Sequence, residues 1–552
     1  MNVRRRDILR AALAATVGPL ASVRLPAATL GAGAECARNQ RLYLPADDGY
    51  LGRLRPRGRP IAIAAGPVGA LPRGVTHGPY AYRAHFREHD YRNPTLVFER
   101  GERVRIRFDN RLTQPTVVHW HGLTLDTPND GSGNFVVAAG EQYDYDFEIR
   151  NRGGLYWYHP HPHGSTAAQV YGGMYGLLEI EDDDNARLRH ALDLVPGTTE
   201  WTLVMQDRRP GPYAPSEHDR THGYLGNEMY INGAACGTRE VANRIYRLRI
   251  LNACNARTLR LAFRTRDGAS LPFYLIGTDC GLLGKPLRCE EAFLASAERL
   301  DLLLDLRDAG KGDTIMLESL GFDPMHGEGQ EAPAAPEPAA HDHAAATDNA
   351  DHAAMGHDHA AMAHDHAAMM AGASRSGWPE GTARAMLELR VGRKTSYERD
   401  LPHALSTVPQ IATEGARERP FRLTYHKGRW SINDRTFVMG ETPIEVARGT
   451  REVWLLRNYY TSMPHAMHLH GFQFDVLERE TSPDQVKPLV VDDHGRLASD
   501  LGRKDTILVW PGESVRIAID FSIPFPGPQT YVFHCHNLEH EDAGMMLGVK
   551  VT

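Results

Sequence analysis

The chain has 552 residues, 28 histidines, six cysteines and a formal net charge of -7 at pH 7. This length corresponds to roughly three or four domains, and an acidic balance without any basic block argues against a nucleic-acid partner. Many histidines with few cysteines indicate metal chemistry and exclude a fold held together mainly by disulfides.

Residues 1–34 have the composition of an export signal. Basic residues precede a short apolar run, and the small residues Ala32, Gly33 and Ala34 follow it. The run is too short to span a bilayer, and no later segment is apolar enough to do so. Residues 5–9 (RRDIL) resemble the twin-arginine signal, whose passengers are exported folded; an ordinary secretory signal is the alternative. We therefore expect a periplasmic or otherwise extracytoplasmic protein without a stable membrane anchor.

Most of the remaining chain alternates short β-type runs with Gly, Pro and Asp breaks, as in TLVFERGERVRIRFDN from Thr95 and RIYRLRILNACN from Arg244. Strand-length runs with frequent turn residues and few long amphipathic stretches predict an all-β protein built of sandwiches or barrels.

Two distant parts of the chain share one sequence plan. Arg100-Gly101 is followed by Asn110 and then by HWHG, and Arg448-Gly449 is followed at the same distance by Asn458 and then by HLHG. Further on, Gly-Glu leads to YWYHPH in the first part and to YVFHCH in the second. The run RIYRLRILNACN repeats only the beginning of the plan. We predict three related β-domains over residues 43–185, 195–322 and 383–552, with metal ligands only in the first and third.

Between the second and third predicted domains lies a Pro-, Ala-, His- and Met-rich insertion, residues 323–378. Its second half is a seven-residue repeat, and its candidate accessory metal ligands are Met355, His357, His359, Met362, His364, His366 and Met369. In a helix, five of these would form one stripe of metal ligands. The alternative is a flexible linker with weak, non-specific metal affinity.

Four His-X-His pairs stand at the duplicated positions. Residues i and i+2 of a strand point to the same face, so each pair can direct two imidazoles into one cleft. Imidazole suits copper, and eight imidazoles could hold several ions. The pairs are His119/His121, His159/His161, His468/His470 and His534/His536.

The last pair encloses Cys535, whose side chain must point away from its neighbours toward a second site. A thiolate with two imidazoles and a weak axial thioether is the ligand set of a blue-copper electron-transfer centre. Cys535, His540 and Met545 fit as local ligands, and His465 fits as the second imidazole. The two histidines beside Cys535 would then carry electrons to the multinuclear cluster through covalent bonds.

HWHG, WYHPHPHG, HAMHLHGF and HCHNLEHEDAGMM resemble the four copper motifs of the multicopper oxidases. The resemblance extends over nearly all of residues 43–552 and is strongest to the three-domain bacterial group of laccases and periplasmic cuprous oxidases. It implies three cupredoxin-like domains and four copper ions, and an enzyme that couples four one-electron oxidations to reduction of dioxygen to water.

The resemblance also implies which residues hold each copper. His163 and Met546 match no ligand position, and we expect His163 to lie at the surface or behind the ligands and Met546 in the core. The implied ligands are His465, Cys535, His540 and Met545 for the type 1 copper, His119 and His468 for the type 2 copper, and His121, His159, His161, His470, His534 and His536 for the type 3 pair.

Reduction of dioxygen needs protons at a buried cluster, so carboxylates are expected near it. Asp130 matches the family's acidic residue beside the type 2 copper, and Glu541 matches a carboxylate on the proton path to the type 3 pair; for each, a solvated loop acid is the alternative. We also expect a disulfide among Cys236, Cys254, Cys280 and Cys289 after export, without assigning the pair.

The electron donor is left open between Cu(I), with the insertion gathering copper, and phenols or aromatic amines, with the insertion as a passive linker. A copper-sequestering protein without activity is a third, weaker reading, because no ligand is missing. Cuprous oxidases of this group often carry an Asp and Met residues before the first type 1 histidine, whereas residues 459–464 (YYTSMP) retain one Met and lack the Asp. We expect electrons to enter where a type 1 histidine reaches the surface of a monomer.

Overall fold

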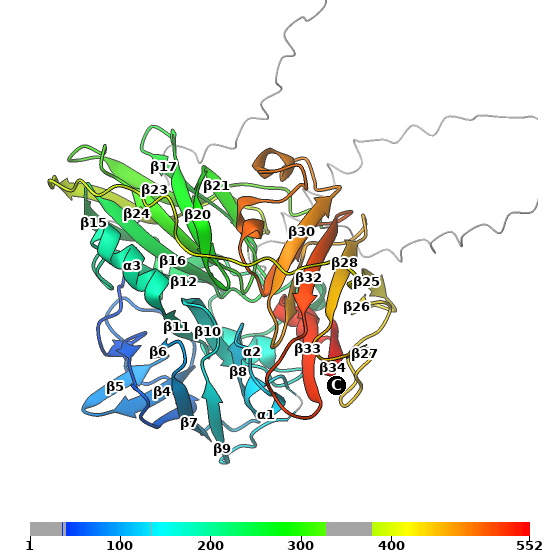
Figure 1. Cartoon of the computed structure of the whole chain (residues 1–552). Coiled ribbons are helices and arrows are strands. Elements are labelled where there is room, and N and C mark those ends of the chain that lie inside the picture. Colours follow the sequence, from blue (N-terminus) through cyan, green and yellow to red (C-terminus); the bar gives the residue numbers. More distant parts are fainter. Residues whose placement is uncertain (1–35, 37–39, 134, 327–377) are drawn as a thin grey trace, which may run out of the picture.

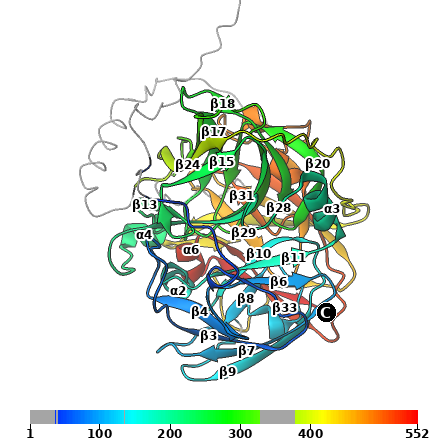
Figure 2. The same cartoon turned by 90° about the vertical axis from the view of Figure 1, so that its left-hand side faces the viewer.

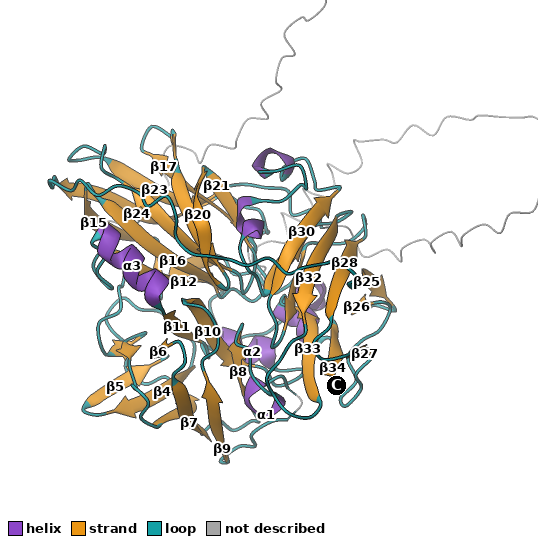
Figure 3. Cartoon of the chain, viewed as in Figure 1, coloured by secondary structure: helices purple, strands orange, loops and turns teal. Residues whose placement is uncertain are grey.

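A computed structural model describes residues 36, 40–133, 135–326 and 378–552 (Figure 1). Their strands form six sheets, which pack in pairs into three cupredoxin-like sandwich domains. The helices are short and lie at the edges of the sandwiches and between them (Figure 3), and no helix of the described ranges is long and apolar enough to cross a membrane. The predicted export signal and residues 327–377 of the insertion lie outside the described residues.

The first domain pairs a six-stranded sheet with a five-stranded one. Its elements are β1 (Gly49–Tyr50), β2 (Arg53–Leu54), β3 (Ile61–Pro67), β4 (Tyr80–Phe86), β5 (His89–Arg92), β6 (Thr95–Glu99), β7 (Arg103–Asn110), β8 (Val118–His121), α1 (Thr127–Asp130), β9 (Gln142–Glu148), β10 (Gly154–Pro160), α2 (Thr166–Tyr171), β11 (Gly176–Glu181) and α3 (Asp183–Leu192). The sheet orders are β1-β5-β4-β3-β7-β9 and β2-β6-β11-β10-β8. Strand β7 shows why the sequence forms a sandwich. Val104, Ile106 and Phe108 alternate with arginines, so one face of the strand packs in the core and the other faces water.

The second domain pairs sheets ordered β14-β13-β12-β16-β22-β19-β20 and β15-β24-β23-β17-β18, with β21 also pairing β17. Its elements are β12 (Glu200–Arg208), α4 (Glu217–His222), β13 (Glu228–Ile231), β14 (Ala234–Ala235), β15 (Gly237–Ala242), β16 (Ile245–Asn252), β17 (Leu259–Thr265), β18 (Ser270–Leu271), β19 (Phe273–Thr278), β20 (Gly281–Cys289), β21 (Glu291–Leu294), β22 (Arg299–Asp305), β23 (Thr314–Ser319) and β24 (Arg384–Arg393).

Strand β24 corrects the predicted boundary between the second and third domains. It pairs with β15 and β23 of the second domain, and Leu387, Leu389 and Val391 pack in the core of that domain. The insertion therefore connects two antiparallel strands of the second domain, β23 and β24, and does not separate two domains. The change in composition therefore marks the connection between two paired strands, not a domain boundary.

The third domain pairs sheets ordered β26-β25-β28-β32-β30 and β27-β34-β33-β29-β31. Its elements are β25 (Arg417–His426), β26 (Arg429–Ile432), β27 (Ile444–Val446), β28 (Arg451–Asn458), β29 (His465–Leu469), β30 (Phe474–Glu480), η1 (Lys487–Leu489), η2 (Ala498–Leu501), β31 (Thr506–Val509), β32 (Ser514–Asp520), β33 (Gln529–Cys535), α6 (Leu538–Asp542) and β34 (Met546–Val551).

Each domain has its own apolar core, and smaller clusters seal the contacts between domains. Trp157 and Leu251 belong to the cluster between the first and second domains, and Phe293 and Trp510 to the one between the second and third. Helices α2, α4 and α6, one from each domain, meet where the three domains join (Figure 2). These contacts hold the first and third domains face to face.

The prediction that two of Cys236, Cys254, Cys280 and Cys289 bond to each other was wrong. Cys36 bonds to Cys236, with Cα atoms 5.0 Å apart, and Cys254, Cys280 and Cys289 are free thiols. The reason is that the N-terminal segment runs beside β15, where the Leu42 amide donates to the Thr238 carbonyl (3.0 Å). That pairing brings Cys36, 200 residues away in sequence, to Cys236.

Candidate metal centres

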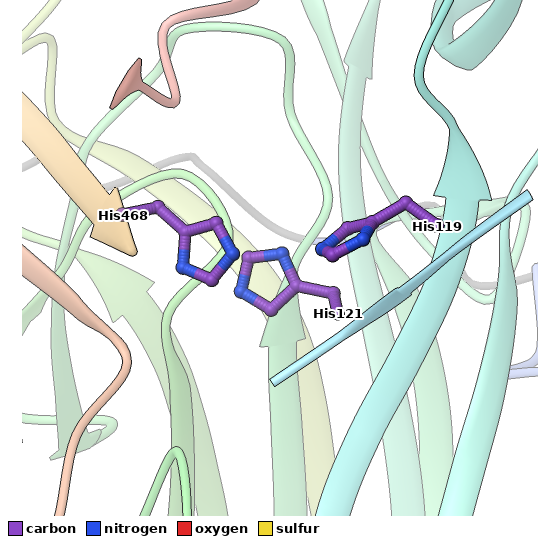
Figure 4. A group of neighbouring side chains, drawn as sticks. All are labelled: His119, His121 and His468. Carbon is purple, nitrogen blue, oxygen red and sulfur yellow. The ribbon is translucent and has the colours of Figure 1, made fainter. Parts of the chain in front are cut away.

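The four His-X-His pairs lie on two pairs of neighbouring strands or one residue beyond their ends. In the first domain β8 pairs with β10, which places His159 opposite His119. In the third domain β29 pairs with β33, which places His534 opposite His468. All eight imidazoles are fully buried. His119 and His121 reach toward His468 from the facing domain (Figure 4), and the His121 and His468 rings stack at 3.7 Å.

The eight imidazoles divide into groups whose ligand atoms all lie within 4.8 Å of one another. The two histidines expected at the type 2 copper lie together with a type 3 histidine, and the six expected at the type 3 pair separate into two triads. Every group draws on both the first and the third domain. The groups are His119, His121 and His468; His121, His159 and His536; and His161, His470 and His534.

The hydrogen bonds of these rings fit metal binding. His119, His159 and His468 each donate from Nδ1 to a backbone carbonyl, at 2.7, 2.9 and 2.7 Å. Within the described residues their Nε2 atoms have no hydrogen-bond partner, and neither ring nitrogen of His536 has one. Buried polar atoms are rarely left unpaired, and a ligating histidine commonly fixes its second nitrogen on a carbonyl.

The protonation state of the rings also suits a metal. Burial lowers the pKa of all eight imidazoles, and neighbouring groups, mostly other histidines, lower most of them further. The rings are therefore neutral at ordinary pH, which is the form that binds copper.

A separate group with the expected type 1 ligands lies on the other face of β33. The Cys535 sulfur is 3.6 Å from His465 Nδ1 and 3.7 Å from His540 Nδ1. Met545 is buried in the same core as Cys535. Burial raises the pKa of the Cys535 thiol to about 12, so the thiolate that copper requires would form as the metal binds.

Both predicted carboxylates contact the histidine cluster. Asp130 accepts a hydrogen bond from His470 Nδ1 (2.9 Å), and its backbone carbonyl accepts one from His119. Glu541 lies 3.5 Å from His161 Nε2 and 3.4 Å from His534 Nδ1. Burial raises the pKa of both carboxyl groups well above their ordinary values. A carboxyl group beside the cluster whose pKa is raised holds its proton more readily than an ordinary one and can supply it to reduced oxygen.

The sequence analysis did not identify Asp505, which lies just before β31. Its carboxylate accepts from His121 Nε2 (3.1 Å) and from the Thr506 hydroxyl (2.9 Å), and it forms a buried ion pair with Arg299 of the second domain. No motif signals this residue, because His121 is 384 positions away in sequence.

Other predicted residues lie where they were expected or outside the described ranges. His163 is exposed, with its ring against Phe437, and Met546 is buried. The accessory histidines and methionines of the insertion are not among the described residues.

The expected route for electrons is wrong in one respect, because neither type 1 histidine reaches the surface. His465 and His540 are both 0% exposed, and His540 Nε2 donates to the carbonyl of Thr221 in α4 (2.8 Å). A helix of the second domain therefore covers the type 1 site.

The fold and these two centres define a blue-copper oxidase architecture, and comparison with known proteins agrees. Family models described as multicopper oxidase match residues 82–185 and 401–552. The chain belongs to the multicopper oxidase family. Its residues fit four copper ions, which let such an oxidoreductase pass electrons from a reducing substrate to dioxygen.

Among particular relatives, the crystal structure of the McoA multicopper oxidase from Aquifex aeolicus is similar, with a TM-score of 0.74 and 31% identity, covering 93% of this chain and 99% of that one. The multicopper oxidase mco of Staphylococcus aureus is 27% identical over 467 residues, 83% of this chain and 82% of that protein. A laccase of Bacillus subtilis is 27% identical over 528 residues, 83% of this chain and 88% of that protein.

Proposed function

We propose that this multicopper oxidase oxidises Cu(I) outside the cytoplasm and so contributes to copper tolerance. The observation that carries the proposal is the cover over the type 1 site: His540 is buried and its outer nitrogen is held by the Thr221 carbonyl. A bulky phenol cannot touch that ring without displacing α4. A small metal ion needs only a site on the covering helix.

The place of the insertion supports the same donor. Phe322 and Met325, just before it, pack on the cluster that contains Ala466, the neighbour of the type 1 ligand His465. The His/Met repeat of residues 355–369 thus belongs to an insertion whose first described residues lie beside the type 1 site. Imidazole and thioether are ligands that copper accepts.

The cysteines support an extracytoplasmic location. Disulfides persist in oxidising compartments and are rare in the cytosol, and the Cys36–Cys236 bond uses a residue just after the predicted cleavage site. Together with the twin-arginine-like signal, this favours export to the periplasm. All ligand groups come from one chain, so a monomer suffices, which size-exclusion chromatography with light scattering would test.

The second candidate is a laccase acting on phenols or aromatic amines, with the insertion as a passive linker. It is favoured by the similarity to a protein named laccase. A copper-sequestering protein without activity is disfavoured, because every ligand expected for the type 1, type 2 and type 3 coppers is present and buried.

Oxygen uptake by copper-loaded protein separates these candidates. We would measure it with Cu(I) and with a phenol, using the whole chain and a variant that lacks residues 341–370. We expect the deletion to depress Cu(I) oxidation and to spare or raise phenol oxidation. Equal rates in both proteins would reduce the insertion to a linker. Uptake with the phenol alone would make the protein a laccase, and no uptake with any donor would support sequestration.

A further inference from the structure

Helix α4 carries two histidines one turn apart. His218 and His222 are four residues apart, and their rings stack at 4.3 Å. This spacing puts both rings on one face of a helix, where such pairs often bind metal. The ring of His326, at the start of the insertion, lies 5.6 Å from that of His222. We call His218, His222 and His326 the α4 histidine cluster.

Two of these rings are oriented by hydrogen bonds that leave one nitrogen available. His222 Nδ1 donates to the His218 carbonyl (3.2 Å), which leaves Nε2. His326 Nε2 contacts the Glu380 carboxylate at 2.7 Å, which leaves Nδ1. Glu380 is itself buried and accepts from the Thr258 amide (2.7 Å). A carboxylate behind an imidazole is the usual support of a metal-binding histidine.

The protonation of His222 agrees with this role. Burial, together with His218 and His326, lowers the pKa of His222 to about 4. The ring is therefore neutral and free to bind a metal at neutral and mildly acidic pH.

The cluster is joined to the type 1 site by a short path. The Thr221 carbonyl, which precedes His222 in the chain, accepts from His540 Nε2 (2.8 Å) and from the Trp430 indole (2.7 Å). An electron leaving an ion on His222 passes through the imidazole, the His222 backbone, the peptide bond to Thr221 and one hydrogen bond to reach a type 1 ligand.

We propose that the α4 histidine cluster is the docking site from which Cu(I) gives its electron to the type 1 centre. This inference rests on the proposed function. Each bound Cu(I) loses one electron along the path through Thr221 to His540 and leaves as Cu(II). Four such ions and four protons convert one dioxygen into two waters, so the electrons balance.

The three rings of the α4 histidine cluster do not form a preassembled metal site, which suits an ion that is a substrate. The three histidines are not among the described groups whose ligand atoms all lie within 4.8 Å of one another, so binding requires the rings to move closer together. A site that must assemble binds its ion less tightly than the buried cluster binds its own, and a spent Cu(II) ion can leave.

Steady-state kinetics test the proposal in the whole copper-loaded protein. In the double variant His222→Gln/His326→Gln, we expect kcat/KM for Cu(I) to fall at least about tenfold relative to kcat/KM for a phenol, because losing even a residue that supports a metal ligand typically costs about 10–100-fold. His85→Gln, an exposed histidine of the first domain, is the matched control and should leave the ratio unchanged. An unchanged ratio in the double variant would overturn the proposal.

Metal binding gives a readout that does not depend on turnover. Ag(I) is a redox-inert substitute for Cu(I), and its stoichiometry can be measured by titration calorimetry on copper-loaded protein lacking residues 341–370. We expect the double variant to bind one Ag(I) fewer than its parent, and equal stoichiometry would refute the site. If the wild type oxidised a phenol but not Cu(I), the proposed function would fall, while the Ag(I) difference would still decide whether these histidines bind metal.

Discussion

Asp505 joins all three domains, and replacing it tests whether that junction supports the copper site. Its carboxylate pairs with Arg299 of the second domain and holds His121 of the first (3.1 Å), and all three side chains are buried. Burial disfavours the charged carboxyl group, but Arg299 offsets this and the pKa of Asp505 lies below its ordinary value. The group is therefore ionised at working pH.

We predict that Asp505→Asn destabilises the copper-free protein by about 3 kcal/mol. Removing one partner of a buried ion pair costs about 3–5 kcal/mol, and the lower value applies because Asp279 remains 3.8 Å from Arg299. Losing the group that orients His121 should also weaken copper binding at the cluster by about 10–100-fold.

The two effects need separate assays. Urea unfolding of the copper-free protein gives the first, as the shift in the midpoint of the earliest transition, because three domains need not unfold in one step. Copper retained against a series of chelators gives the second. Asp144→Asn is the matched control: Asp144 forms an exposed ion pair with Arg107 (3.1 Å), and its replacement should change stability by less than about 1 kcal/mol. If Asp505→Asn behaved like the control in both assays, the reasoning would be wrong.

Four further predictions concern the copper centres and the chain as a whole. Cys535→Ser should remove the intense blue absorption and stop turnover, because a hydroxyl cannot replace the thiolate; a coloured, active variant would contradict the type 1 assignment. Glu541→Gln should keep the blue absorption but slow oxygen uptake by about a hundredfold or more, because an amide cannot give up a proton; undiminished uptake would exclude that role. Copper-free protein should lose stability as pH falls below about 6.5, because the buried imidazoles have lowered pKa values and the unfolded chain then binds more protons; a urea midpoint that is constant across this range would argue against it. Cys36→Ser should lower the thermal midpoint, since closing a loop of 200 residues is worth about 5 kcal/mol in the chain-entropy estimate, and Cys236→Ser should match it.

The histidine ligands could be predicted from the sequence because strand alternation is a local rule. His119 and His121 lie on one face of β8, and Cys535 points away from its two neighbours, as a period of two requires. How the type 3 histidines divide into triads depends on the pairing of β8 with β10 and on how two domains face each other. Neither is encoded in any short stretch.

The features that the sequence analysis did not predict all involve contacts between segments far apart in the chain. Thr221 covers His540 from 319 positions away, and Cys36 finds Cys236 because of a strand pairing that composition does not reveal. The insertion was placed between domains because its composition changes abruptly, whereas β24 after it pairs with β23 and β15 and completes a sheet of the second domain. Composition shows where a sequence stops resembling strands, but only pairing shows which sheet receives the next one.

The division of the imidazoles between two domains makes metal loading an assembly reaction. The type 1 ligands all belong to the third domain, whereas each group of the larger cluster needs both the first and the third. Binding of the three clustered ions therefore also stabilises the association of the first and third domains. Removing the copper ions with a chelator should weaken the contact between the first and third domains. A folding intermediate in which these domains have not yet docked could bind the type 1 copper first, and the other three ions only after docking.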